Sequence, residues 1–243
     1  IIHFSNFSIN CIKKKYTFKN CSHYVVPHGN YINNFEPINK NLAKKRLGLS
    51  TKKNTVICIG ATRNIFDYFL ILSFKKIFLN NKFNFIYAGD LYNWIYRLFP
   101  WKLGFSIKKI TVLFSKIINK FNFNKDSLLI INKTIDDDEL NILCSASDIL
   151  LIAKKSNLNS GNIALGFSFS KIVLGPEIGN IGEILKSTSN PTYKLKKLNS
   201  IEIIEKCQKA LVKKVGLMNN KYILEECNWN KIGNNLKMIF DMI

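Results

Sequence analysis

The sequence of 243 residues has few arginines and no long apolar run, and each shortage excludes a class of protein. Arginine occurs only at Arg46, Arg63 and Arg97, which does not favour an extended surface for bidentate contacts to phosphates or base edges. No uninterrupted apolar stretch reaches the roughly 20 residues that a transmembrane helix needs. Lysine and asparagine interrupt every candidate, so we expect a chain that does not span a membrane.

The cysteines lack the spacing of a metal site or a disulfide framework. They form no closely spaced pair, and no histidine pattern accompanies them. Such thiols suit a reducing compartment, so we expect a cytoplasmic protein with no bound metal. The sequence begins on Ile1 without a leader of signal-peptide type, and we expect it to be part of a longer chain. The six cysteines are Cys11, Cys21, Cys58, Cys144, Cys207 and Cys227.

Positive charge is in excess, because 36 lysines and arginines stand against 16 acidic residues and give a net charge of +20. One interpretation is solvated surface lysines, in a chain whose lysine, asparagine and isoleucine reflect AT-rich coding. A second is a nucleic-acid partner, since phosphate neutralisation supplies most non-specific affinity. A third is peripheral contact with an anionic membrane. We favour the first, leave the membrane contact open and expect no specific nucleic acid.

Short apolar runs alternate with helical patterns, which is typical of a parallel sheet covered by helices. The run "IFDYFLILSFKKIFLN" predicts a helix over 65–80, and an acidic start predicts another over 136–147. The stretch 201–243 is helical by its apolar spacing. We therefore predict an α/β fold, a Rossmann-like parallel sheet with helices on both faces. The predicted strands are 22–29, 54–61, 83–90, 126–133, 148–155 and 171–175.

Small polar residues follow one predicted strand directly. Asn159, Ser160 and Gly161 come after the run "ILLIA" and open the next helical segment. Helix N-termini at the carboxyl ends of parallel strands offer unpaired N–H groups to anions. Ser160 can cap the helix, and Gly161 lets a ligand approach the backbone. The alternative is an ordinary serine cap with no ligand.

The chain resembles the C-terminal, donor-binding domain of glycosyltransferase family 4 (glycosyl transferases group 1), which has the GT-B fold. The matching pieces occur in family order over nearly the whole chain. Early in the sequence they are "VVPHGNYINNF", "AKKRLGL" and "VICIGATR". Later pieces are "FIYAGD", "DDDELNILCSASDILLIA", "NSGNIALGFSFSKIVLGPEIGNIGE" and the tryptophan-bearing "CNWNKIGNNLKMIF".

The resemblance implies four segments. Residues 1–34 would be the tail of an N-terminal acceptor domain, and 35–53 a connector between domains. Residues 54–225 would form the Rossmann-like nucleotide-sugar-binding domain, and 226–243 a closing C-terminal helix. Most of the acceptor domain would then be missing, so we expect this chain alone to be inactive.

The implied activity is that of a hexosyltransferase-type glycosyltransferase. It would transfer a sugar, with retention of anomeric configuration, from a nucleotide diphosphate sugar to a glycan or lipid-linked acceptor in cell-surface polysaccharide synthesis. The resemblance implies no cofactor and no essential metal, since a helix N-terminus and cationic side chains stabilise the departing diphosphate instead. The expected location is cytoplasmic, at the inner face of the membrane.

By the same resemblance Arg63, directly after a strand, would lie on the diphosphate as a catalytic and binding residue, with Thr62 assisting. Asn159, Ser160 and Gly161 would bind the donor, with backbone N–H groups of Ser160 and Gly161 on the phosphates. A surface salt bridge is the alternative for Arg63, and a core or capping role is the alternative for Thr62.

Other positions follow in the same way. Lys133, Thr134 and Ile135 match the loop whose backbone lies against the nucleotide base, with a plain strand-to-helix turn as the alternative. Glu183, in the loop after "GPEIGNIG", would contact donor or acceptor hydroxyls as a second catalytic residue. His28 could touch donor or acceptor, or serve only in a turn. The acidic run Asp136–Glu139 is interpreted as a helix start in preference to a catalytic group.

The sequence also departs from the family pattern. Asn157 and Leu165 stand where many members have a pair of glutamates, and no lysine follows Arg63 within a few residues. A non-catalytic binding or partner module that keeps the fold is therefore the alternative function, and a nucleic-acid-binding module is a more remote one. The aromatic and basic segment 91–123 suits either helices packed on the sheet or a membrane interface.

Overall fold

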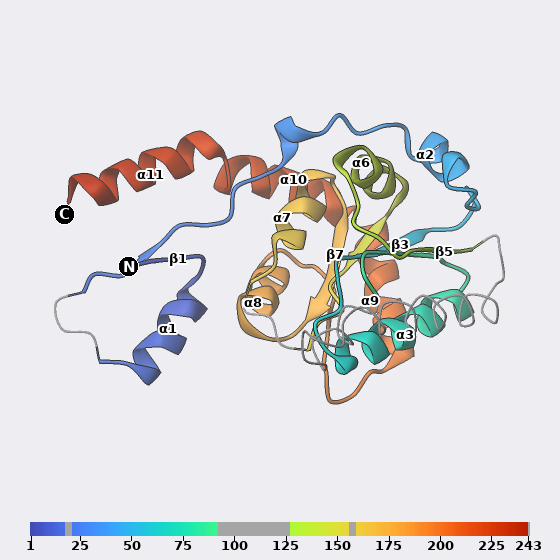
Figure 1. Cartoon of the computed structure of the whole chain (residues 1–243), viewed down its shortest axis with the longest axis horizontal. Coiled ribbons are helices and arrows are strands. Elements are labelled where there is room, and N and C mark those ends of the chain that lie inside the picture. Colours follow the sequence, from blue (N-terminus) through green and yellow to red (C-terminus); the bar gives the residue numbers. More distant parts are fainter. Residues whose placement is uncertain (18–20, 92–126, 156–158, 243) are drawn as a thin grey trace, which may run out of the picture. The chain divides into compact units, whose positions relative to one another are not determined.

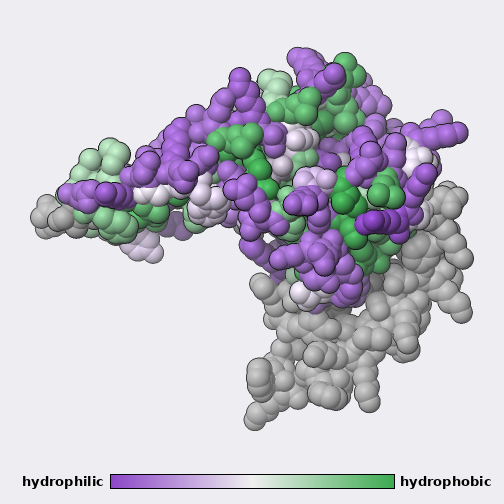
Figure 2. Space-filling view, turned by 90° about the horizontal axis from the view of Figure 1, so that it is seen from above, coloured by the Kyte–Doolittle hydropathy of each residue, from purple (hydrophilic) through white to green (hydrophobic). Residues whose placement is uncertain are grey.

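The structure, a computed structural model, describes residues 1–17, 21–91, 127–155 and 159–242 (Figure 1). The chain divides into two compact units, one of Ile1–Glu36 with Ser156–Ile243 and the other of Pro37–Lys155. Among the described residues, no helix has the length and apolar character that a membrane crossing requires. Hydrophilic residues cover most of the described surface on the face in Figure 2, with smaller hydrophobic patches between them.

In the unit Pro37–Lys155, four parallel strands stand in the order β5-β4-β3-β6. The register places Ile57 beside both Ile86 and Leu150, and all three side chains are fully buried. Strands that are buried on both faces read as continuous apolar runs, as these do. Their bounds are β3 Thr55–Ile59, β4 Asn84–Ala88, β5 Leu128–Ile131 and β6 Ile149–Leu151.

Helices cover both faces of these strands. Helix α3 (Ile65–Asn80) lies on one side in Figure 1, and α2 (Lys40–Arg46) and α6 (Asp137–Ala146) lie on the other. Helix α3 begins where the Asn64 side chain accepts a hydrogen bond from the backbone N–H of Asp67, as a capping residue does. It packs Phe74 and Phe78 into the core, and the Phe78 ring stacks on that of Phe85 in β4. The predicted parallel sheet with helices on both faces is thus confirmed.

A buried ion pair ties α2 to the start of β6. The Lys44 ammonium lies 3.3 Å from Asp148 Oδ2, and the Lys44 side chain is only 2% exposed. Burial lowers the pKa of Lys44. Burial by itself would raise the pKa of Asp148. A hydrogen bond from Lys40, the charge of Lys44 and a hydrogen bond from the N–H of Thr55 outweigh burial, so the pKa of Asp148 lies below its ordinary value.

The other unit carries the parallel strands β7 (Ile172–Pro176) and β8 (Thr192–Tyr193). The helices α7 to α10 all contact β7. Helix α9 ends at Val212, and Lys214, in the left-handed conformation at φ 53°, opens α10. The helices are α7 Gly161–Ser168, α8 Gly179–Ser187, α9 Ser200–Val212 and α10 Val215–Glu226.

The N-terminal and C-terminal segments of this unit pack together. Val26 shares a small apolar cluster with Ile232 and Ile239 of the last helix. The Trp229 indole N–H donates to the Asn30 carbonyl at 2.8 Å, at the turn that follows β2. The remaining elements are β1 Ile2–His3, α1 Asn6–Lys15, β2 Tyr24–Val25, the short 3-10 helix η1 Ile32–Asn34 and α11 Trp229–Asp241; β1 and β2 are parallel.

Several elements were not predicted from the sequence, among them β1, α1, α8 and β8. Residues 179–187, expected to be part of a loop, form α8, and 171–175, expected to be the last strand, is followed by the further strand β8. Gly179 and Gly182 weaken the local helical pattern, and their helix is stabilised by packing on β7. The limits of the four predicted segments, 1–34, 35–53, 54–225 and 226–243, stay a prediction.

Candidate functional site

Arg63 lies at the carboxyl end of β3, as its position in the sequence predicted. The strand leaves the sheet through Gly60, whose positive φ of 108° suits glycine. Thr62 then fixes the turn, because its N–H donates to Asp90 O at 3.0 Å and its hydroxyl donates to Leu91 O at 2.8 Å. Thr62 is fully buried, which supports its core role, whereas Arg63 is exposed.

Asp67, in the first turn of α3, binds the backbone of the turn that carries Arg63. Its carboxylate accepts the backbone N–H of Arg63 at 3.1 Å and that of Lys155 at 3.0 Å. The residue is 1% exposed. A buried carboxylate with such charge-assisted bonds is a rigid anchor, so it fixes the backbone from which the Arg63 side chain projects.

Lys154 is a residue that sequence reasoning missed. It follows β6, and its ammonium donates to Ala61 O of the Arg63 turn and lies 3.7 Å from Asp67 Oδ2. Its side chain is 12% exposed. Burial lowers the pKa of Lys154, the Asp67 charge opposes this, and the nearby Arg63 guanidinium adds to the lowering. The contact with Ala61 joins residues 93 positions apart, so no local motif could have revealed it.

The loop Lys133–Ile135 connects β5 to α6 and is largely exposed at Lys133 and Thr134. The Lys133 ammonium lies 2.6 Å from Glu139 Oε1, and this hydrogen bond raises the pKa of Lys133. Asp136 accepts the Glu139 N–H at 2.8 Å as the N-cap of α6. The predicted helix-start role of the acidic run is therefore confirmed.

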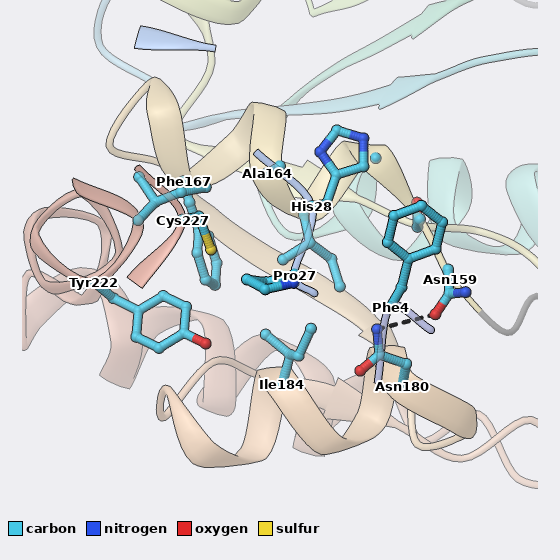
Figure 3. Close-up of a pocket in the computed structure, with 14 residues that line it drawn as sticks. Phe4, Pro27, His28, Asn159, Ala164, Phe167, Asn180, Ile184, Tyr222 and Cys227 are labelled. Carbon is cyan, nitrogen blue, oxygen red and sulfur yellow. Dashed lines mark hydrogen bonds between the residues drawn. The ribbon is translucent and has the colours of Figure 1, made fainter. Parts of the chain in front are cut away.

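In the other unit, Ser160 occupies the N-cap position of α7 but makes no capping hydrogen bond with its side chain. The expected serine cap is therefore wrong: the backbone takes the N-cap conformation, at φ −144° and ψ 117°, without the hydroxyl serving it. The Asn159 amide oxygen instead accepts from the Asn180 side chain of α8 at 3.0 Å (Figure 3). Asn180, 6% exposed, is a second residue that the sequence did not reveal.

A cavity of about 320 Å³ opens beside this turn, within the same unit (Figure 3). Ser160, Gly161, Asn159 and Asn180 form a polar part of its lining. The remainder is mainly apolar and includes Phe4, Pro27, Phe167, Ile184 and Tyr222.

His28 also lines the cavity, and its orientation is fixed. Its Nδ1 lies 2.8 Å from Gly29 O. Because a carbonyl oxygen only accepts hydrogen bonds, Nδ1 carries the proton, and Nε2 is left unprotonated in the neutral ring. A methyl group added at Gly161 would lie 3.6 Å from His28 Nε2 and 3.5 Å from the Tyr31 hydroxyl. The protein itself thus has room for a side chain at position 161.

Glu183 differs from its predicted setting. It lies on α8, exposed, and it is not among the residues that line the cavity. Leu165, at one of the positions where many family members have glutamate, is buried within α7. Asn157 and almost all of the aromatic segment 91–123 lie outside the described residues. In the part of the chain that is described, no three His, Cys, Asp or Glu side chains gather to hold a metal ion.

Comparison with known proteins identifies the fold. No protein-family model matches the chain, and no curated protein matches it. Among solved structures, sucrose-phosphate synthase from Thermosynechococcus elongatus matches 99% of this chain and 57% of its own, at 13% identity and a TM-score of 0.68. WaaG, a glycosyltransferase involved in lipopolysaccharide biosynthesis, matches 98% of this chain and 62% of its own, at 13% identity and a TM-score of 0.61.

A third structure contains the corresponding part alone. The C-terminal domain of a glycosyl transferase group 1 family protein (LpcC) from Francisella tularensis matches 82% of this chain and 98% of its own, at 12% identity and a TM-score of 0.52. The chain thus has an α/β fold of the Rossmann-like class. More particularly, it has the fold of the C-terminal part of GT-B glycosyltransferases, and it spans 57% and 62% of the length of the first two proteins.

Proposed function

We propose that this chain is the donor-binding part of a glycosyltransferase of family 4 type, which binds a nucleotide diphosphate sugar. The observation that carries the proposal is the Arg63 turn: an exposed guanidinium at the carboxyl end of a parallel strand, on a backbone that Asp67 fixes. In open α/β folds ligands bind beyond the carboxyl ends of the strands. The GT-B fold makes a nucleotide diphosphate sugar the natural ligand.

The helix start at Ser160–Gly161 is the second element of the proposed site. The N-terminus of a helix carries a partial positive charge, and the Ser160 hydroxyl makes no capping hydrogen bond there. A helix start of this kind would stabilise a departing diphosphate electrostatically, and so would the Arg63 guanidinium, so that no essential metal and no cofactor are required. Asn159 would position the same turn through Asn180, while Lys133, Thr134 and Ile135 would lie against the base.

Transfer with retention to a glycan or lipid-linked acceptor completes the proposal. Glu183 would contact donor or acceptor hydroxyls, although its place on α8 requires the ligand to reach that helix. The role of WaaG in lipopolysaccharide biosynthesis supports cell-surface polysaccharide synthesis by a cytoplasmic, hexosyltransferase-type enzyme at the inner face of the membrane. The acceptor would come from that pathway.

One surface supports peripheral contact with an anionic membrane. Four lysines of α8, α9 and the α9–α10 corner line a groove of about 340 Å³ with Thr192. At the α9–α10 corner, close in sequence to Lys213, Val212, Leu217 and Met218 are 84%, 62% and 57% exposed. Basic residues next to exposed apolar side chains suit an anionic lipid surface. The four lysines are Lys186, Lys206, Lys209 and Lys213.

A non-catalytic module that keeps the fold is the alternative. Two observations support it. Leu165 is buried and apolar, so it cannot bind a ligand as the glutamate of many family members would, and no lysine follows Arg63 within a few residues. Such a module could still bind a nucleotide sugar, so binding alone does not separate it from an enzyme. Transfer activity of the longer protein with its acceptor domain does.

The first experiment is a thermal-shift screen with UDP, GDP and their sugars. A ligand that binds only the native state adds about 2.7 kcal/mol of stability when its free concentration is roughly 100-fold above Kd. We expect one nucleotide series to raise the melting temperature in a concentration-dependent way. If all of these ligands leave it unchanged at millimolar concentration, the proposal is wrong.

A further inference from the structure

Lys154 has an unusual position for a lysine. Its ammonium donates a hydrogen bond to Ala61 O, in the turn that carries Arg63, and pairs with the Asp67 carboxylate. Lysine side chains are among the least often buried, and a buried one needs a reason. The next residue, Lys155, shows the ordinary alternative: it is exposed, with its ammonium 3.6 Å from the centre of the Phe66 ring.

Neutralising Asp67 does not by itself require Lys154. The Asp67 carboxylate already accepts hydrogen bonds from two backbone N–H groups, those of Arg63 and Lys155. The lysine also lies close enough to Arg63 for the two cations to affect each other electrostatically. Two cations held at one turn repel one another, and an anion bound there would relieve that repulsion.

We infer that Lys154 is the second cation of the proposed diphosphate site, supplied by the end of β6 instead of by α3. The inference rests on the proposed function. A diphosphate carries more negative charge than a monophosphate, and Arg63 alone matches only part of it. The ammonium has three donors, of which Ala61 O takes one and Asp67 attracts another, and the third serves the ligand. Lys154 would thus take the place of the lysine that many family members have a few residues after the arginine and that this sequence lacks.

Three variants test the inference, each titrated with UDP and UMP, and with GDP and GMP. Lys154→Gln removes the charge but keeps an N–H donor for Ala61 O, and Lys154→Arg keeps the charge. Lys155→Gln is the matched control on the neighbouring residue. We expect Lys154→Gln to weaken nucleoside diphosphate binding by about tenfold or more while changing monophosphate binding by less than about threefold. Lys154→Arg should retain most of the affinity, and Lys155→Gln should behave like the wild type.

A structural role predicts a different pattern. If Lys154 only holds the turn in place, Lys154→Gln will weaken the monophosphate and the diphosphate by the same factor, and the inference fails. It also fails if Lys154→Gln binds diphosphate normally while Arg63→Ala does not, which would leave the proposed function intact. If the wild type binds none of the four nucleotides, both the proposed function and the inference are wrong.

Discussion

Trp229 lies so close to Gly29 that no side chain fits between them: a Cβ at position 29 would overlap the indole ring. The same indole donates its N–H to Asn30 O. We predict that Gly29→Ala destabilises the protein by about 1–3 kcal/mol, the usual cost of overpacking. Urea unfolding at equilibrium measures the change.

Gly233→Ala is the matched control, because nothing lies within 4 Å of a Cβ at that exposed position in α11. It should stabilise the protein by about 0.5–1 kcal/mol through helix propensity. In the background of Trp229→Ala, the Gly29→Ala change should lower the free energy of unfolding much less than it does in the wild type. Strict additivity of the two changes would show that the contact is not the cause.

Asp148→Asn should cost about 3–5 kcal/mol at neutral pH, because it leaves the buried ammonium of Lys44 without its counter-charge. The pKa of Asp148 is lowered by folding, so its contribution is fully present above the ordinary value of 3.8 and is lost as pH falls through the lower folded value. The stability difference between wild type and variant should therefore shrink in strong acid. A difference that is independent of pH would contradict this assignment.

Gly161→Ala should separate ligand binding from folding. The added methyl group would meet only ordinary contacts with Tyr31 and His28, so the melting temperature without ligand should change little. Because the methyl group would occupy the helix start where the proposed phosphate lies, nucleotide affinity should fall by about tenfold or more. Normal nucleotide affinity in Gly161→Ala would remove this helix start from the site.

Charge reversal tests the proposed membrane contact. Lys209→Glu with Lys213→Glu should abolish most binding to vesicles that contain phosphatidylglycerol, since each lysine near an anionic surface contributes about 1 kcal/mol. Lys14→Glu with Lys15→Glu, exposed on α1, makes the same change in net charge elsewhere. Equal losses in the two double variants would indicate a general charge effect and not a surface at the α9–α10 corner.

Much of the fold could be predicted from the sequence, because buried parallel strands are continuous apolar runs. The run "IFDYFLILSFKKIFLN" coincides with α3, and the acidic run before α6 begins it as expected. Helix α8 escaped prediction since Gly179 and Gly182 make its segment look like a loop. Its helical form depends on packing against β7, which a local pattern does not contain.

The candidate site was only partly predictable. Arg63 and Gly161 were predicted because each comes after a strand in the sequence, and in parallel sheets ligands bind beyond the carboxyl ends of the strands; their roles in binding stay a prediction. Lys154 was missed since its partner Ala61 is remote in sequence, and Asn180 was missed for the same reason. Ser160 has the right position for a cap, yet its hydroxyl does not act as one, and only the side-chain geometry reveals that.

Titration calorimetry with UDP and GDP on the wild type, Arg63→Ala and Arg46→Ala tests the central claim most directly. Arg46 is an exposed arginine at the end of α2 and provides the matched control. We predict that the wild type and Arg46→Ala bind one of the two nucleotides equally well, and that Arg63→Ala binds it at least about tenfold more weakly. Equal binding by all three proteins, or no binding by the wild type, would contradict the account.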